Sequence, residues 1–143
     1  MAAYAVFCCL TRSLNVVFEE FPLTLGAAEM PQNFTDKTLT FLDLNGKQLA
    51  ELSSDIGNLT NLTTLKLGEN RLRHLPLEIG NLTNLEHLHL SGNQITKLLP
   101  EIGNLTNLED LNLEGNQITI LPPGIGDLPL KESSKNRGRP YSL

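Results

Sequence analysis

The sequence predicts a repeat solenoid, in which short strands from successive coils stack side by side around an aliphatic core. Leucine or isoleucine recurs every 23 residues through four units with no insertion. Tryptophan is absent and aromatic residues make up only 5% of the chain, so leucine and isoleucine must build the core. A single unit cannot bury these side chains unless another unit stacks on it, and the units are therefore expected to fold together.

Each unit begins with the pattern LxxLxL, which predicts a short strand. The second and third leucines lie two residues apart, so a strand points both to one side and turns the intervening residues to the other. The inward positions of the four units are Leu42, Leu65, Leu88 and Leu111, followed by Leu44, Leu67, Leu90 and Leu113.

A corner asparagine follows the strand in three of the four units, as Asn70, Asn93 and Asn116. We predict that these side chains form a ladder that satisfies backbone groups of their own coil and of the next one. Lys47 takes this place in the first unit, so its corner is expected to need another hydrogen-bonding solution. Further along each unit an Ile-Gly pair closes the opposite side, where glycine is expected to permit a tight turn.

The segments LTTLKLGENRL, LEHLHLSGNQI and LEDLNLEGNQI resemble the signature of the leucine-rich repeat family. With the continuation LPxEIGNLTNL, the chain is similar to the 23-residue class found in intracellular Ras-associated scaffolds and disease-resistance-like proteins. The resemblance implies an α/β repeat: a right-handed leucine-rich-repeat solenoid with a short parallel sheet on the concave side and a 3-10 or irregular convex side. It also implies protein recognition as the usual task.

The predicted organisation has three parts. Residues 1–35 form an N-terminal segment with a capping helix at about 3–21 and a linker. Residues 36–130 form the repeats, and residues 131–143 form a disordered basic tail with four of the chain's 11 basic residues. The repeats divide into 36–58, 59–81, 82–104, 105–127 and a truncated fifth unit. Pro100 lies one place later than Pro76 and Pro122 in their units, so the convex side of the third unit is expected to run differently.

The capping helix rests on an apolar stripe with helical spacing, formed by Phe7, Leu10, Leu14, Val17 and Phe21. Such a helix would cover the open end of the first unit. Two other interpretations of residues 1–21 stay open. The first is a signal or anchor sequence. The second is a start of the chain that never packs on the repeats.

Composition and motifs exclude several classes of function. The net charge of -5 argues against nucleic acid as a partner, because phosphate binding needs a basic face. No stretch is long and apolar enough for a membrane span. The adjacent Cys8 and Cys9 are interpreted as thiols of a reducing compartment. Because no catalytic or phosphate-binding motif is present, the sequence predicts neither enzyme activity nor a cofactor.

The outward residues of the strands and the residues beside them are the candidate partner-binding site. This surface carries more acidic than basic residues, which predicts another protein or peptide with basic character as the partner. An alternative is that these side chains only keep the face soluble. His87, His89 and Asp110 could together hold a metal ion, but nothing else in the sequence supports a metal site. They are therefore interpreted as contact residues, and no metal is predicted. The candidate positions are Phe41, Asp43, Thr64, Lys66, Glu69, Arg71, His87, His89, Asp110 and Asn112.

The predicted function is a non-catalytic protein-interaction module in intracellular signalling or defence, with a cytoplasmic location. One alternative is a secreted, glycosylated recognition domain, because Asn33, Asn58, Asn61, Asn81 and Asn104 each begin an N-x-[ST] motif. Most of these motifs come with the repeated NLT turn, and the cysteine-rich caps usual in extracellular relatives are missing. Another alternative is a structural fragment of a longer array.

Overall fold

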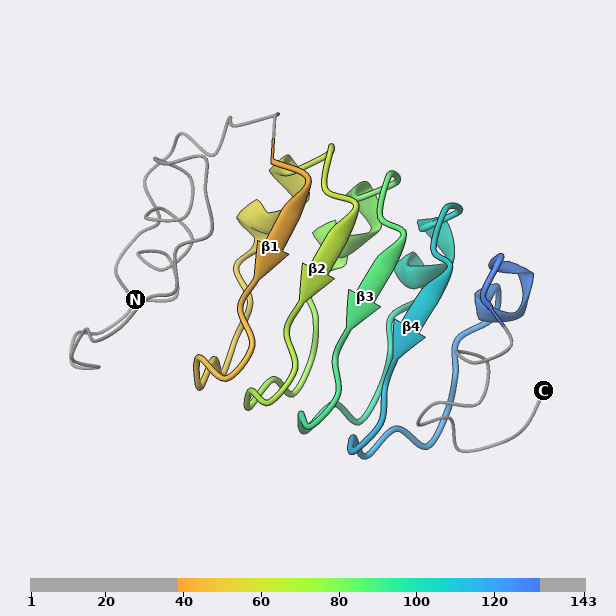
Figure 1. The fold of residues 1–143 in the computed structure, drawn as a ribbon. Coiled ribbons are helices and arrows are strands. Elements are labelled where there is room, and N and C mark those ends of the chain that lie inside the picture. Colours follow the sequence, from red (N-terminus) through yellow and green to blue (C-terminus); the bar gives the residue numbers. More distant parts are fainter. Residues whose placement is uncertain (1–38, 132–143) are drawn as a thin grey trace.

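The computed structural model describes residues 39–131, which contain all four complete repeats from their first strand onward. Four short strands form one parallel sheet in the order β1-β2-β3-β4 (Figure 1). The strands are β1 (Phe41–Asp43), β2 (Thr64–Lys66), β3 (His87–His89) and β4 (Asp110–Asn112). The predicted capping helix, the linker and residues 132–143 lie outside the described residues. Within residues 39–131 no helix is long and apolar enough to cross a membrane.

The strand leucines stack on one another as the spacing predicts. Leu65 pairs in register with Leu88, and Leu88 with Leu111. All three are at most 1% exposed. Each buried leucine contributes about 1.5–3 kcal/mol relative to an exposed one. The predicted solenoid with a parallel sheet is therefore confirmed, and its core lies behind the sheet.

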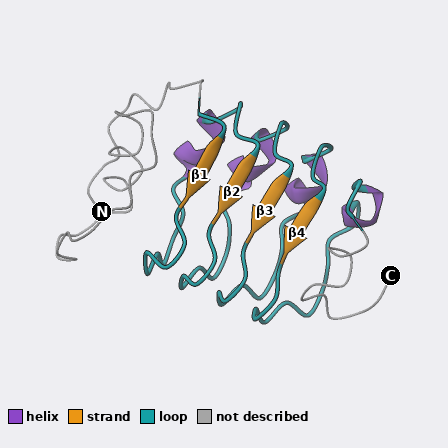
Figure 2. Cartoon of the chain, in the orientation of Figure 1, coloured by secondary structure: helices purple, strands orange, loops and turns teal. Residues whose placement is uncertain are grey.

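Short 3-10 helices cover the side of each coil opposite the sheet (Figure 2). The first three are five residues long and the last has three residues. They are η1 (Ser54–Asn58), η2 (Leu77–Asn81), η3 (Pro100–Asn104) and η4 (Ile125–Asp127). Each of the first three buries its isoleucine against the core, which closes the coil.

The glycine after this isoleucine is needed for space. A tight turn is predicted here, but Gly57, Gly80 and Gly103 lie within the 3-10 helices, and positive φ among the described glycines occurs only at Gly46, Gly92, Gly115 and Gly124. A Cβ added at Gly57 would lie 2.7 Å from the Cβ atom of Glu78 in the next coil. One added at Gly80 would lie 2.9 Å from the carbonyl oxygen of Glu101. Close approach of neighbouring coils, not a tight turn, therefore excludes a side chain at these two positions.

The displaced proline does not change the third coil, contrary to expectation. η3 starts at Pro100, the position equivalent to Leu77 at the start of η2. Proline fits the first turn of a helix because its missing N–H group would have no intrahelical partner there. In the second coil, Pro76 takes the N-cap position with an extended backbone. Both placements are compatible with the same helix.

The corner asparagines bond to their own coil and to the coil before it, so the predicted direction toward the next coil is wrong. The Oδ1 atom of Asn93 accepts a hydrogen bond from the N–H of Leu72 at 3.0 Å. Its Nδ2 atom donates to the carbonyls of Leu67 at 2.9 Å and Leu90 at 3.0 Å. The reason is geometric, since the chain bends after each strand and brings the carbonyl of the leucine that follows the strand within reach of the next coil's asparagine.

This direction explains why Lys47 is tolerated in the first unit. The corner of that unit is served by Asn70 of the second, which donates to the carbonyl of Leu44 at 2.8 Å. The Oδ1 atom of Asn70 also accepts from the N–H of Leu49 at 3.0 Å. No replacement for an asparagine at position 47 is therefore needed at this corner.

A second set of asparagines joins the coils on the exposed side and was not anticipated. The Nδ2 atom of Asn84 donates to the carbonyl of Thr60 at 2.8 Å. The Nδ2 atom of Asn107 donates to the carbonyl of Thr83 at 2.7 Å. Both bonds are exposed to water, so each contributes less than the buried corner ladder.

Candidate functional site

The candidate site is the open face of the sheet, called the sheet face below. It consists of the outward residues of the four strands, all exposed or half-buried, while the inward leucines are buried. The register places them in two rows across the strands. One row contains Phe41, Thr64, His87 and Asp110, and the other contains Asp43, Lys66, His89 and Asn112.

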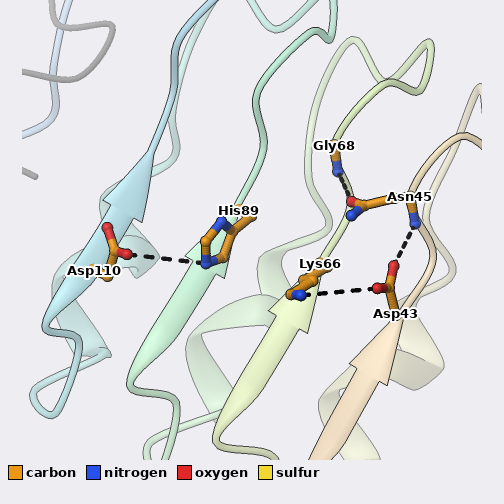
Figure 3. A network of polar contacts seen from close by, with 6 residues as sticks. All are labelled: Asp43, Asn45, Lys66, Gly68, His89 and Asp110. Carbon is orange, nitrogen blue, oxygen red and sulfur yellow. Dashed lines mark hydrogen bonds and ion pairs between the residues drawn. The ribbon is translucent and has the colours of Figure 1, made fainter. Parts of the chain in front are cut away.

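At the β1 end of the sheet face, an aromatic ring, a cation and an anion meet. The Nζ atom of Lys66 lies 3.9 Å from Oδ2 of Asp43 and 5.3 Å from the ring centroid of Phe41. The ring keeps 49% of its surface exposed. Asp43 also accepts a hydrogen bond from the N–H of Asn45 at 3.0 Å, as Figure 3 shows. Exposed pairs of this kind contribute at most about 1 kcal/mol each, so this cluster shapes the surface more than it stabilises the fold.

At the other end, His89 and Asp110 approach each other diagonally across β3 and β4. The Nε2 atom of His89 lies 3.9 Å from Oδ2 of Asp110 (Figure 3). The backbone register also sets His87 beside Asp110, as the sequence predicts. Within residues 39–131, no group of three or more histidine, cysteine, aspartate or glutamate side chains has the geometry to hold a metal.

Lys131 belongs to the folded array, although the sequence assigns it to a disordered tail. Its N–H donates to the carbonyl of Glu109 at 2.8 Å. Its Nζ atom lies 2.8 Å from Oε2 of the same residue. The hydrogen bond and charge of Lys131 lower the pKa of the Glu109 carboxyl, and Glu109 in turn raises the pKa of the lysine. The repeat spacing carried the signal, since position 131 lies 23 residues after Leu108.

Replacing Lys131 with methionine should move the pKa of Glu109 back toward the ordinary carboxyl value. The pair stabilises the fold at pH values above that ordinary value, and this contribution is lost as the pH falls through the lowered pKa. Carboxyl-carbon NMR titration of Glu109 measures the change. Lys97→Met removes the same charge from an exposed position on another side of the coil and should leave the titration unaltered. An unchanged Glu109 titration in Lys131→Met would show that the ion pair does not form in solution.

Glu69 and Arg71 lie in the turn that follows β2, beyond the two rows of the sheet face, and both are exposed. Glu69 has a φ of 53°, in the left-handed region that disfavours residues with a Cβ atom. The equivalent positions in the other coils are Gly46, Gly92 and Gly115, with φ of 64°, 65° and 71°. In the second coil the glycine comes one place earlier, at Gly68, whose N–H lies 2.6 Å from Oδ1 of Asn45.

Glu69→Gly should therefore raise the free energy of unfolding by about 0.5–1 kcal/mol, because relief of the left-handed strain exceeds the entropy that glycine loses on folding. Urea denaturation followed by circular dichroism measures this change. The reverse control is Gly46→Ala, where an added Cβ would meet nothing within 4 Å, so only the φ angle matters. It should lower stability by about 1 kcal/mol. A destabilised Glu69→Gly variant would contradict the strain assignment.

Stacked 23-residue coils with one parallel strand each and a corner asparagine ladder define a solenoid repeat protein. Comparison with protein families identifies it further. The model of the family described as "Leucine-rich repeat region" matches residues 37–114, and the model of the family described as "Leucine Rich Repeat" matches residues 107–128. The chain belongs to the leucine-rich repeat family. Domains of this family generally mediate protein–protein interactions and are typically non-catalytic.

Solved structures agree with this assignment. A leucine-rich-repeat protein of Leptospira interrogans is 45% identical, with a TM-score of 0.65, over 66% of this chain and 24% of its own. Internalin C2 of Listeria monocytogenes is 23% identical, with a TM-score of 0.54, over 66% of this chain and 50% of its own, which supports the fold alone. The chain thus spans a quarter to a half of these proteins. No curated protein sequence matches it.

Proposed function

We propose that this chain is a non-catalytic interaction module that binds another protein or peptide through the sheet face. One observation carries the proposal. The structure buries the strand leucines and leaves eight outward side chains exposed or half-buried in two registered rows. A polar and partly charged surface with one exposed aromatic ring is typical of recognition sites that keep bound water.

The partner is proposed to have basic character. Asp43 and Asp110 lie on the sheet face, and Glu86 and Glu109 lie beside it. Lys66 is the one lysine within the strands β1 to β4. Complementary charge would favour a cationic partner and speed its association. We further propose a role in intracellular signalling or defence, in the cytoplasm, because the LPxEIGNLTNL continuation resembles that of intracellular scaffolds.

Charge reversal on the sheet face tests the proposal. The partner is first recovered by affinity capture with the native full-length product and identified by mass spectrometry. The triple variant Asp43→Lys, Glu86→Lys and Asp110→Lys should weaken binding of that partner at least about tenfold, because it replaces three acids that attract a basic partner with lysines that repel it. Circular dichroism should stay unaltered.

The matched control reverses three charges away from the sheet face. It combines Glu51→Lys, Glu78→Lys and Asp127→Lys, which lie on or near the helical side of the coils. This control should bind the partner as the native protein does. Equal binding by the sheet-face triple and the native protein would reject the sheet face as the binding site.

A secreted, glycosylated recognition domain remains the second candidate. The observation in its favour is that Asn58, Asn61, Asn81 and Asn104, which begin N-x-[ST] motifs, are all exposed. Exposed acceptor asparagines are a requirement for glycan attachment. Glycosidase treatment of protein from its native host, followed by mass spectrometry, decides between the two. A loss of mass favours secretion, and an unchanged mass favours the intracellular proposal.

A further inference from the structure

We propose that the sheet face binds an extended peptide running across its strands, with an apolar side chain at Phe41 and a basic side chain at Asp110, about four residues apart. This inference rests on the proposed function and deepens it. It commits to a short extended segment of a basic protein as the occupant.

The two ends of the sheet face differ in chemistry. At β1, Phe41 is the one large apolar side chain among the outward strand residues, and 49% of it is exposed. At β4, Asp110 and Glu109 lie next to Glu86 of the adjacent coil, whose carbonyl accepts hydrogen bonds from the N–H groups of Glu109 at 2.9 Å and Asp110 at 3.0 Å. The basic residues near these acids are Lys131 and His89, and the histidine is cationic only when it is protonated. The β4 end is therefore net negative when His89 is neutral.

The spacing follows from the geometry of the sheet. Phe41, Thr64, His87 and Asp110 form one row through the strand register. Neighbouring strands lie about 4.8 Å apart, so about 14 Å separate the first and last members of the row. An extended peptide advances about 3.3–3.4 Å per residue, and its alternate side chains point to the same side. Side chains about four residues apart can therefore reach both ends from one face of the peptide.

Lys66 makes the spacing selective. It lies on β2, and its ammonium group is held near the β1 end by Asp43 and the ring of Phe41. A basic side chain placed about two residues from the apolar one would approach this ammonium group. Repulsion there disfavours the shorter spacing, whereas the acidic β4 end favours the longer one.

Three synthetic peptides of equal length test the inference by NMR titration of the full isotope-labelled chain. The first carries leucine and arginine about four residues apart in an otherwise Ser/Ala sequence. The second has the same composition with the two residues about two apart, and the third replaces arginine with glutamate. The first peptide should shift the backbone amides of both β1 and β4, and should bind about fivefold more tightly than either of the others.

Single variants with matched controls locate the two contacts. Asp110→Asn should reduce the preference for the arginine peptide over the glutamate peptide, whereas Asp127→Asn on η4 should preserve it. Phe41→Ala should weaken the first peptide about fivefold, the loss expected for one partly buried apolar contact. Leu77→Ala, which removes a side chain that is 57% exposed at the start of η2, should not.

Several outcomes would overturn this inference. Three of them concern the peptides: equal affinity for all three, amide shifts confined to the helices η1 to η4, or no binding of any peptide. The fourth is a set of amide shifts that depends on protein concentration in the absence of peptide, which would indicate that a second copy of the chain occupies this face. None of them decides the proposed function. The charge-reversed triple and the recovered native partner test that proposal separately.

Discussion

Replacing Asn93 with alanine should lower the free energy of unfolding by about 1–3 kcal/mol, because a buried polar group left unpaired costs about that much. The side chain is 5% exposed and bonds to backbone groups of two coils. Alanine would leave the N–H of Leu72 without its partner, whereas the carbonyl of Leu67 keeps the hydrogen bond from the Nδ2 atom of Asn70 at 2.9 Å. Water cannot easily replace the lost partner in a closed corner. Urea unfolding monitored by far-ultraviolet circular dichroism measures the change.

Asn84→Ala is the matched control for this prediction. Asn84 also joins two coils, but through one hydrogen bond that is exposed to water. Water can take over that bond, so the expected loss is below about 1 kcal/mol. A loss for Asn93→Ala no larger than that for Asn84→Ala would contradict the importance of burial in the corner ladder.

Replacing Leu88 with alanine should cost about 3–5 kcal/mol, the upper part of the range for buried leucines. Leu88 is 0% exposed and lies in register between Leu65 and Leu111. The hydrogen-bonded strands on both sides hold the backbone at a fixed spacing, so the neighbouring coils cannot close the cavity. Urea unfolding again measures the loss.

Leu77→Ala provides the control for this second substitution. It removes the same side-chain atoms from a position that is 57% exposed on η2, and should change stability by no more than about 0.5 kcal/mol. Similar losses for the two variants would mean that Leu88 is not in a packed core. If Leu88→Ala does not fold at all, Leu88→Met keeps the comparison measurable, with an expected cost below about 1.5 kcal/mol.

Much of the fold could be predicted because the repeat spacing fixes the strand register. Once Leu65, Leu88 and Leu111 are aligned, the residues on either side of them must form rows across the sheet. The same spacing could have placed Lys131 at the start of the next unit. The hydrogen bond from its backbone N–H reaches the carbonyl of Glu109, which lies 22 residues earlier, so this bond does not follow the 23-residue spacing of the strand register.

Side-chain direction was the part that spacing could not supply. The corner asparagines reach back to the previous coil because the chain bends at each strand end, which depends on backbone path and not on residue order. The contact between Asp110 and His89 also depends on side-chain direction, because a carboxylate can reach a diagonal neighbour on an adjacent strand. The left-handed φ of Glu69 could have been suspected only from its alignment with three glycines. Whether the sheet face binds a partner stays a prediction.

A methyl NOE spectrum of selectively labelled leucines tests the stacked-coil account most directly. Strong cross-peaks between the methyl groups of Leu65 and Leu88, and of Leu88 and Leu111, are predicted for side chains that pack in adjacent coils. Their absence, or cross-peaks only between leucines close together in the sequence, would contradict the stacking of the coils and with it the open sheet face.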